Sequence, residues 1–208
     1  MPESFPTQFA TIAIAHLLAV VSPGPDFAVV VKQSLGAGRR AAVWTSVGIG
    51  SGILLHVGYS LFGLALFLSR SPALFEAIRY AGAAYLLFLG LSSFRPGSAG
   101  RMAVASGKSA VESPLRSWTV GFMTNALNPK ATLFFLAIFT AVITPGTPLT
   151  WQLFYGFWMS GATMIWFSLV ALLFTSPAIR ERFLRAGHWF TRATGVVLIG
   201  LGLRILLT

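Results

Sequence analysis

Long apolar stretches alternate with short clusters of charged residues along this sequence of 208 residues. A helix that crosses about 30 Å of hydrocarbon needs about 20 residues, because each residue adds about 1.5 Å of length. Stretches of this length occur six times, so the pattern predicts an all-α membrane protein with six transmembrane helices. The predicted spans cover residues 5–31, 41–68, 73–94, 117–143, 149–175 and 189–207.

The composition agrees with this pattern. Hydrophobic residues make up 55% of the chain and charged residues only 10%, whereas a soluble domain carries about 25% charged residues. So few charges cannot cover the surface of a water-soluble fold. The absence of cysteine excludes disulfides and thiolate metal sites. The N-terminus has no basic residue before its apolar stretch, which is unlike a cleaved signal peptide, so we expect the first span to be retained.

The basic residues are concentrated in alternate connections between the predicted spans, and cytoplasmic loops carry such an excess of lysine and arginine. The second connection holds only Arg70 and the fourth holds none. We therefore expect a multi-pass membrane protein with both termini outside. The same rule accounts for the net charge of +10 without a nucleic-acid partner. The basic residues of the first, third and fifth connections are Lys32, Arg39, Arg40, Arg95, Arg101, Lys108, Arg116, Arg180, Arg182 and Arg185.

The longest polar segment divides the chain into two halves. Residues 95–116 are rich in glycine, serine and arginine, which predicts a flexible cytoplasmic linker between repeats at 1–94 and 117–208. The tetrapeptide Ser-Pro-Ala-Leu at 71–74 has a counterpart in Ser-Pro-Ala-Ile at 176–179. Because each half has three spans, the second half would enter the membrane in the opposite direction. The sequence thus predicts two inverted three-helix repeats, a plan found in many secondary transporters.

The first span of each half is interrupted by a proline motif that carries a charge. The motifs are Ser-Pro-Gly-Pro-Asp at 22–26 and Asn-Ala-Leu-Asn-Pro-Lys at 125–130. Proline removes a helix donor and clashes with the preceding turn, so each motif should break its helix. Backbone groups freed in this way are tolerated in a membrane only where they face protein or a water-filled cavity. Such breaks indicate a binding site.

An ionised side chain at the centre of a membrane helix costs about 2.5 to 3.5 kcal/mol, so Asp26 and Lys130 are expected to pair or to line a pathway. We expect the two to lie close together between the halves, where Lys130 and the helix beginning near Asp26 suit a carboxylate and Asp26 suits an ammonium group or a coupling proton. The alternative is that the prolines only kink the helices and the two charges form a pair that holds the halves together. The predicted substrate-binding and coupling residues are Pro23, Gly24, Pro25, Asp26, Thr124, Asn125, Asn128, Pro129 and Lys130.

These motifs resemble the LysE/RhtB family of bacterial amino-acid exporters. The resemblance rests on residues 22–26, on Gly48, Gly50 and Gly52, and on Gly-Phe-x-Thr-Asn-x-x-Asn-Pro-Lys at 121–130. It extends over essentially the whole chain, and Pro-Gly-Pro followed by Asp-Phe looks most like the threonine and homoserine exporters. The resemblance implies export of a neutral amino acid by proton antiport. It implies an amino acid, protons and the lipid bilayer as partners, with a homodimer as an allowed assembly.

Other function classes receive less support from the sequence. An intramembrane serine protease would use Ser51, but Ile49 stands where that motif has glycine, so we expect no enzyme. Export of another small solute, such as a metal cation, stays open as the alternative function, although Asp26 is the one carboxylate well inside a span. No metal or cofactor is expected in the protein itself. His16 and His56 could relay protons, but histidines among apolar neighbours more often serve packing, and neither is included in the site.

Overall fold

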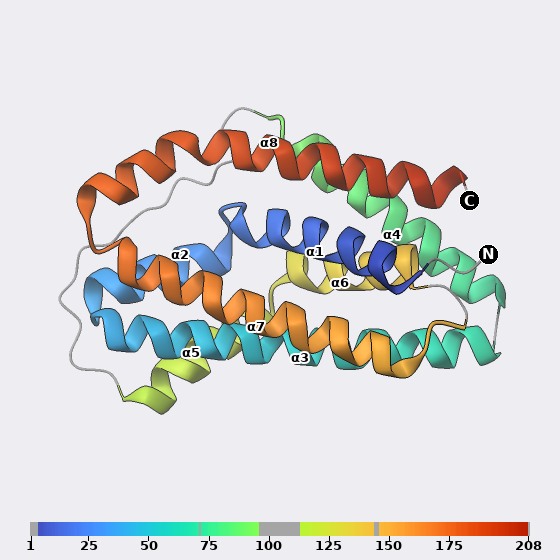
Figure 1. Ribbon diagram of the computed structural model, residues 1–208, viewed down its shortest axis with the longest axis horizontal. Coiled ribbons are helices and arrows are strands. Elements are labelled where there is room, and N and C mark those ends of the chain that lie inside the picture. The colour runs from blue at the N-terminus through green and yellow to red at the C-terminus, as the bar shows by residue number, and fades with distance from the viewer. Residues whose placement is uncertain (1–3, 71, 96–112, 144–145, 208) are drawn as a thin grey trace.

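The computed structural model describes residues 4–70, 72–95, 113–143 and 146–207, and the regular structure in these residues is entirely helical. Figure 1 shows the helices in chain order. The described residues leave out most of the predicted linker, residues 96–112, and residues 144 and 145 of the fourth connection. The helices are α1 Phe5–Val21, α2 Pro25–Gly36, α3 Arg39–Arg70, α4 Pro72–Ser92, α5 Pro114–Ala126, α6 Pro129–Val142, α7 Leu149–Leu173 and α8 Pro177–Leu207.

Helices lie at all six predicted positions, and both predicted breaks are present. The first span is α1 followed by α2, with a bend of 51° between them, and the fourth is α5 followed by α6. Within the described residues, α7 and the Arg39–Gly63 part of α3 are long and apolar enough to cross a membrane, and α1 with α2 would make a third such span. The remaining spans and the inverted repeat stay predictions.

The helix at the sixth predicted span, α8, is longer than the sequence pattern predicts. It begins at Pro177, whereas the predicted span begins at residue 189. The basic residues Arg182 and Arg185 therefore lie in the helix and not in a loop. Hydrophobicity marks where a helix enters lipid, whereas the helix itself starts at Pro177, because proline suits a first helical position and no proline follows within α8.

Proline marks the start of most helices. Pro25, Pro72, Pro114, Pro129 and Pro177 each open a helix, where the missing N–H has no partner to lose. The order of a broken helix pair followed by two long helices therefore occurs twice along the chain. Pro25 and Pro129 open the second helix of each broken pair, and Pro72 and Pro177 open the last helix of each half.

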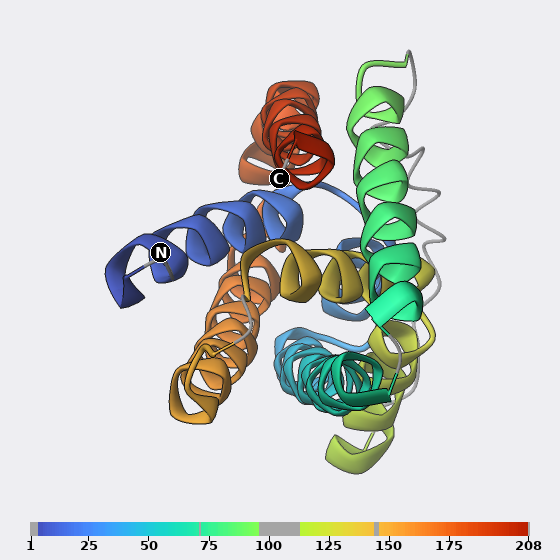
Figure 2. The same cartoon turned by 90° about the vertical axis from the view of Figure 1, so that its right-hand side faces the viewer.

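The helices run roughly along one axis, so the connections gather at the two ends of the molecule. Figure 1 shows both termini at the end that also holds the α3–α4 and α6–α7 connections. The α2–α3 and α7–α8 connections lie at the other end. In the view along the axis (Figure 2), α6 lies in the middle and contacts α1, α3, α4 and α8. The second broken span is thus central to the bundle.

Small residues allow α3 and α5 to cross closely. A β-carbon added at Gly48 would collide with the carbonyl oxygen of Trp118, and one added at Gly121 would collide with that of Thr45. Gly48 is therefore a packing glycine, the role that small residues usually have in membrane helices. Gly200 of α8, in contrast, has open space around it.

The buried apolar residues form two clusters, one on each side of the helix breaks. One cluster includes Ile53 of α3 and Phe135 of α6, and the other includes Phe27 of α2 and Phe167 of α7. The candidate site lies where these two clusters meet, since all four of these side chains line its cavity.

Candidate functional site

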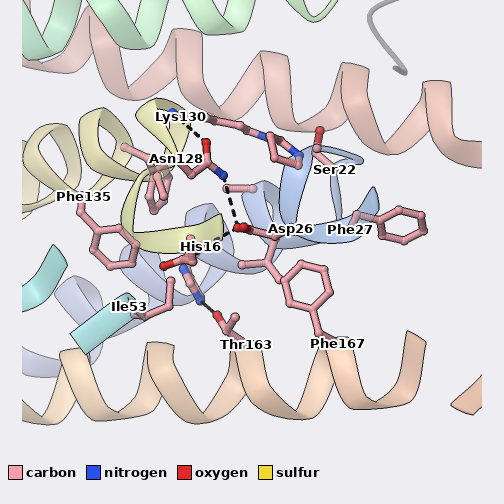
Figure 3. Close-up of a pocket in the computed structure, with 17 residues that line it drawn as sticks. His16, Ser22, Asp26, Phe27, Ile53, Asn128, Lys130, Phe135, Thr163 and Phe167 are labelled. Atoms are coloured by element: carbon pink, nitrogen blue, oxygen red, sulfur yellow. Dashed lines mark hydrogen bonds between the residues drawn. The ribbon is translucent and has the colours of Figure 1, made fainter. Parts of the chain in front are cut away.

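A buried cavity lies where the two broken spans meet. Its lining includes Gly24, Pro25 and Asp26 from the first break and Asn125, Asn128 and Lys130 from the second. Figure 3 shows these side chains together with neighbours from α1, α3, α6 and α7. Six of the nine predicted site residues are thus brought to one cavity by segments about 100 residues apart in the chain.

The remaining three predicted residues lie outside the cavity lining. Pro23 and Pro129 act on the backbone, because they interrupt or begin a helix. Thr124 donates a hydrogen bond from Oγ1 to the Val120 carbonyl oxygen of its own helix, at 2.7 Å. Consecutive helix residues point about 100° apart, so Asn125 faces the cavity whereas Thr124 does not.

Asp26 is held by two asparagines from the other half of the chain. Asn125 Nδ2 donates to Asp26 Oδ2 at 2.9 Å, and Asn128 Nδ2 donates to the same oxygen at 3.3 Å. The other carboxylate oxygen, Oδ1, is buried and has no hydrogen-bond partner among the described residues. One oxygen therefore fixes the side chain, and the other is left to accept a hydrogen bond from a ligand.

Asn128 also organises the break itself. It is the N-cap of α6, and its Oδ1 accepts a hydrogen bond from the Lys130 backbone N–H at 3.0 Å. Asparagine is among the preferred N-cap residues because its side chain satisfies one of the free donors of the first turn. Its amide group thus stabilises the start of α6 with one atom and binds Asp26 with the other.

Lys130 extends toward the break in the first span. A β-carbon at Gly24 would lie 3.7 Å from Lys130 Nζ, so the ammonium group lies directly over this glycine. Among the described residues, the ion pair within 4.0 Å joins Arg79 to Glu76. No carboxylate oxygen lies within this distance of Lys130 Nζ. Asp26 and Lys130 share the cavity, as expected, without forming a salt bridge.

Gly52 of α3 leaves room for the asparagine that holds Asp26. A β-carbon at Gly52 would lie 2.7 Å from Asn125 Oδ1, which is closer than real side-chain contacts. The glycine-rich segment of the second span therefore has a role at the site as well as in packing. This role depends on how α3 and α5 cross, which the sequence pattern does not specify.

The cavity holds one side chain of each charge, and the two are not paired with each other. One acidic and one basic side chain line it, together with two asparagine amides and an apolar wall that includes Phe134 and Phe167. A zwitterion carries one charge of each sign, so this arrangement can bind its two ends at different places. The cavity volume is about 50 Å³, which is room for a few water molecules.

Two histidines that the sequence analysis left out of the site contact it. His16 lines the cavity. His56 does not line it, but its Nε2 donates to the backbone carbonyl oxygen of Asn125 at 2.9 Å, at the end of α5. In the sequence, the indication of a site role for these histidines was that both lie inside apolar spans with no charged residue close by. This indication is weak, because such histidines often serve packing alone. Within the described residues, no group of three or more His, Cys, Asp and Glu is placed to hold a metal ion.

Comparison with known proteins finds efflux proteins that are similar to this chain. The threonine efflux protein of Escherichia coli (strain K12) is 31% identical over 204 residues, which cover 96% of this chain and 98% of that protein. The homoserine/homoserine lactone efflux protein of Salmonella typhimurium is 31% identical over 145 residues, covering 70% of this chain and 68% of that protein. The leucine efflux protein of Salmonella choleraesuis is 29% identical over 153 residues, with coverages of 71% and 69%.

The named relatives are efflux proteins, which agrees with a transporter and not an enzyme. No solved structure matches this chain. The family model described as LysE type translocator matches residues 17–208, and that range contains both helix breaks and all nine site residues predicted from the sequence. The chain therefore belongs to the LysE type translocator family, as its proline motifs indicated.

Proposed function

We propose that this chain exports a neutral amino acid, similar to threonine or homoserine, from the cytoplasm in exchange for protons. The observation that carries the proposal is the cavity between the two helix breaks, which combines Asp26 and Lys130 without a salt bridge between them. Family membership and relatives named for efflux of threonine, homoserine and leucine support an amino acid as the substrate.

In this proposal the two charged side chains bind opposite ends of the amino acid. The substrate ammonium group lies at Asp26, and its carboxylate lies at Lys130 beside Gly24. A charge buried in a membrane protein is costly unless it is paired, so a zwitterion that pairs both side chains is favoured over a ligand that pairs one. A side chain such as that of threonine faces Phe134 and Phe167, with the asparagine amides near its hydroxyl group.

The small cavity volume implies that the bundle opens to admit substrate. An amino acid is larger than the few water molecules for which about 50 Å³ gives room. Transporters built from inverted repeats open by movement of one repeat against the other around a fixed midplane site. The two halves of this chain meet at hydrogen bonds between Asp26 and the asparagines, which are contacts that can rearrange during such a movement.

Asp26 is also the proposed site of proton coupling. When the cavity is open to the outside, a proton that binds Asp26 removes the charge that holds the substrate ammonium group, so the amino acid leaves. The proton is released to the cytoplasm when the cavity opens inward, and a new amino acid can then bind. This order exchanges one proton for one substrate molecule at one carboxylate.

The proposed orientation places both termini outside the bacterial inner membrane. The arginines at the starts of α3, α5 and α8 would then face the cytoplasm, as the positive-inside rule predicts. In this arrangement amino acid bound from the cytoplasm leaves at the end that holds the two termini (Figure 1).

Dipeptide loading tests the proposal directly. Cells that lack this protein and cells that express it are fed dipeptides of threonine, homoserine, leucine and other amino acids, and released amino acids are measured over time. We expect faster release of at least one neutral amino acid from cells with the protein. Asp26→Asn and Lys130→Met should abolish the difference, whereas Glu76→Gln and Lys32→Met, which change a carboxylate and a lysine outside the cavity, should retain it.

Two outcomes would contradict the proposal. Equal release of every amino acid with and without the protein would contradict amino-acid export and favour the metal-cation alternative. Export of normal rate by Asp26→Asn and Lys130→Met variants that reach the membrane would show that the cavity charges serve only structure. Dissipating the proton gradient with an ionophore tests coupling separately, because proton antiport predicts that export slows.

A further inference from the structure

His16 shares the cavity with Asp26 and Lys130 but plays no part in the binding mode described above. It lies in the last two turns of α1, just before the first break, and is 1% exposed. A polar ring buried to this extent requires hydrogen-bond partners. Only one of its two ring nitrogens has a hydrogen-bond partner among the described residues.

One ring nitrogen fixes His16 to α7. His16 Nε2 lies 3.1 Å from the backbone carbonyl oxygen of Met159 and 3.0 Å from Thr163 Oγ1. A carbonyl oxygen can only accept, so Nε2 must carry the hydrogen that is donated to it. In the neutral ring, Nδ1 is then a hydrogen-bond acceptor with a free lone pair.

The other ring nitrogen is unsatisfied. Nδ1 is buried and has no hydrogen-bond partner among the described residues. Asp26 Oδ1, on the same cavity, is in the same state and is also an acceptor. Figure 3 shows His16 held at Thr163, with Asp26 drawn on the neighbouring part of the cavity wall. Asn125 Oδ1 is a third buried acceptor without a partner among the described residues, so the residues that line the cavity present three unsatisfied acceptors that call for a donor.

We propose that His16 is a substrate-binding residue, whose Nδ1 accepts a hydrogen bond from the ammonium group of the exported amino acid. This inference rests on the proposed function and extends it, because it assigns a second acceptor and hence the orientation of the substrate. An ammonium group has three N–H donors, and Asp26 Oδ1 and His16 Nδ1 take two of them.

The same two atoms exclude the reverse orientation of the substrate. A carboxylate at this place would face two acceptors and would gain no hydrogen bond from either. Lys130 Nζ, over Gly24, is the donor that a carboxylate requires. The amino acid thus lies with its nitrogen at Asp26 and His16 and its carboxylate at Lys130 Nζ beside Gly24.

Two substitutions separate this role from simple packing. In His16→Asn the amide oxygen can take the place of Nδ1, but the group that reaches Met159 and Thr163 is lost. In His16→Gln the amide nitrogen can take the place of Nε2 and donate to the Met159 carbonyl, but no acceptor remains at the Nδ1 position. A binding role for Nδ1 predicts that Asn is the better replacement, and an anchoring role predicts that Gln is.

The experiment measures binding of L-threonine to the purified full-length protein in detergent by calorimetry, with L-homoserine and L-leucine as further probes. We expect His16→Gln to weaken binding by about 10-fold to 100-fold, the usual effect of losing a hydrogen bond to a charged group. His16→Asn should weaken the binding of L-threonine less than His16→Gln does. The affinity for 3-hydroxybutyrate, which lacks the ammonium group, should not change in His16→Gln.

Each other result overturns the inference. Unchanged binding by His16→Gln, equal losses in both variants, or a larger loss in His16→Asn would assign His16 to anchoring or packing. If His16→Gln does not fold, His16→Asn decides by itself, because retained binding supports the proposal and lost binding contradicts it. If the wild-type protein binds none of the three amino acids, the proposed function fails together with this inference, whereas normal wild-type binding confines any failure to His16.

Discussion

The side-chain amide nitrogen of Asn125 lies 2.9 Å from the carboxylate oxygen Oδ2 of Asp26, and this contact joins the two broken spans. The two residues are 99 positions apart, in the last turn of α5 and the first turn of α2. Because asparagine is neutral, the contact positions Asp26 without neutralising its charge. A salt bridge with Lys130 would have held the halves together and removed both charges from the cavity.

This contact predicts an energetic coupling between Asn125 and Asp26. A hydrogen bond to a charged group contributes about 1.5 to 3 kcal/mol, so a double-mutant cycle with Asn125→Ala and Asp26→Ala should give a coupling energy in this range. Denaturant unfolding of the purified protein provides the four stabilities. As a control, Thr119→Ala changes an exposed residue of α5 and should show no coupling with Asp26→Ala. Additive effects of the first pair would mean that the contact is not formed in the protein.

Gly52 is predicted to be required for transport because it makes room for Asn125. A methyl group from Gly52→Ala would displace the Asn125 side chain, whose Oδ1 lies in its path, and so disturb its bond to Asp26. We expect a large loss of export at normal membrane abundance, measured by dipeptide loading. Gly58→Ala, on the same helix, meets no atom within 4 Å and should keep full export. Equal activity of the two variants would contradict the role assigned to Gly52.

A buried polar cluster is predicted to stabilise the end of the bundle that holds the termini. Tyr155 donates to Gln8 Oε1 at 3.3 Å, and Gln8 Nε2 donates to Thr147 Oγ1 at 3.2 Å. Tyr155→Phe would leave the buried Gln8 oxygen without its donor, which costs about 1 to 3 kcal/mol of unfolding free energy. Thermal unfolding measures this loss. Tyr80→Phe, at a tyrosine that is 46% exposed, should change stability by less than about 0.5 kcal/mol, and equal effects would argue against the cluster.

The orientation in the membrane can be tested by labelling, because the chain has no cysteine of its own. Single cysteines at Ser4→Cys and Pro148→Cys lie at the end with the termini, and Glu181→Cys lies in the first turns of α8 at the opposite end (Figure 1). We expect an impermeant maleimide to label the first two in intact spheroplasts and the third only after lysis. The opposite labelling pattern would place the termini in the cytoplasm and reverse the proposed direction of export.

The sequence by itself determined where the helices lie and where they break. Apolar length defines a span, and Pro25, Pro129 and Pro177 suit the first position of a helix, because the constraint is in the residue's own backbone. Asp26 and Lys130 could also be identified from sequence, since a charge inside an apolar span is costly enough to require a role. The start of α8 was missed, because hydrophobicity reports lipid contact and not helix length.

Only the tertiary structure decided which side chains meet in the cavity. The sequence pointed to Asp26 with Lys130, whereas the fold places Asn125 and Asn128 on Asp26 and directs Lys130 over Gly24. These partners depend on how far each helix is rotated about its axis and how closely it approaches its neighbours. Close contacts between distant segments, such as Gly48 with the Trp118 carbonyl, set both quantities, and no local pattern encodes them.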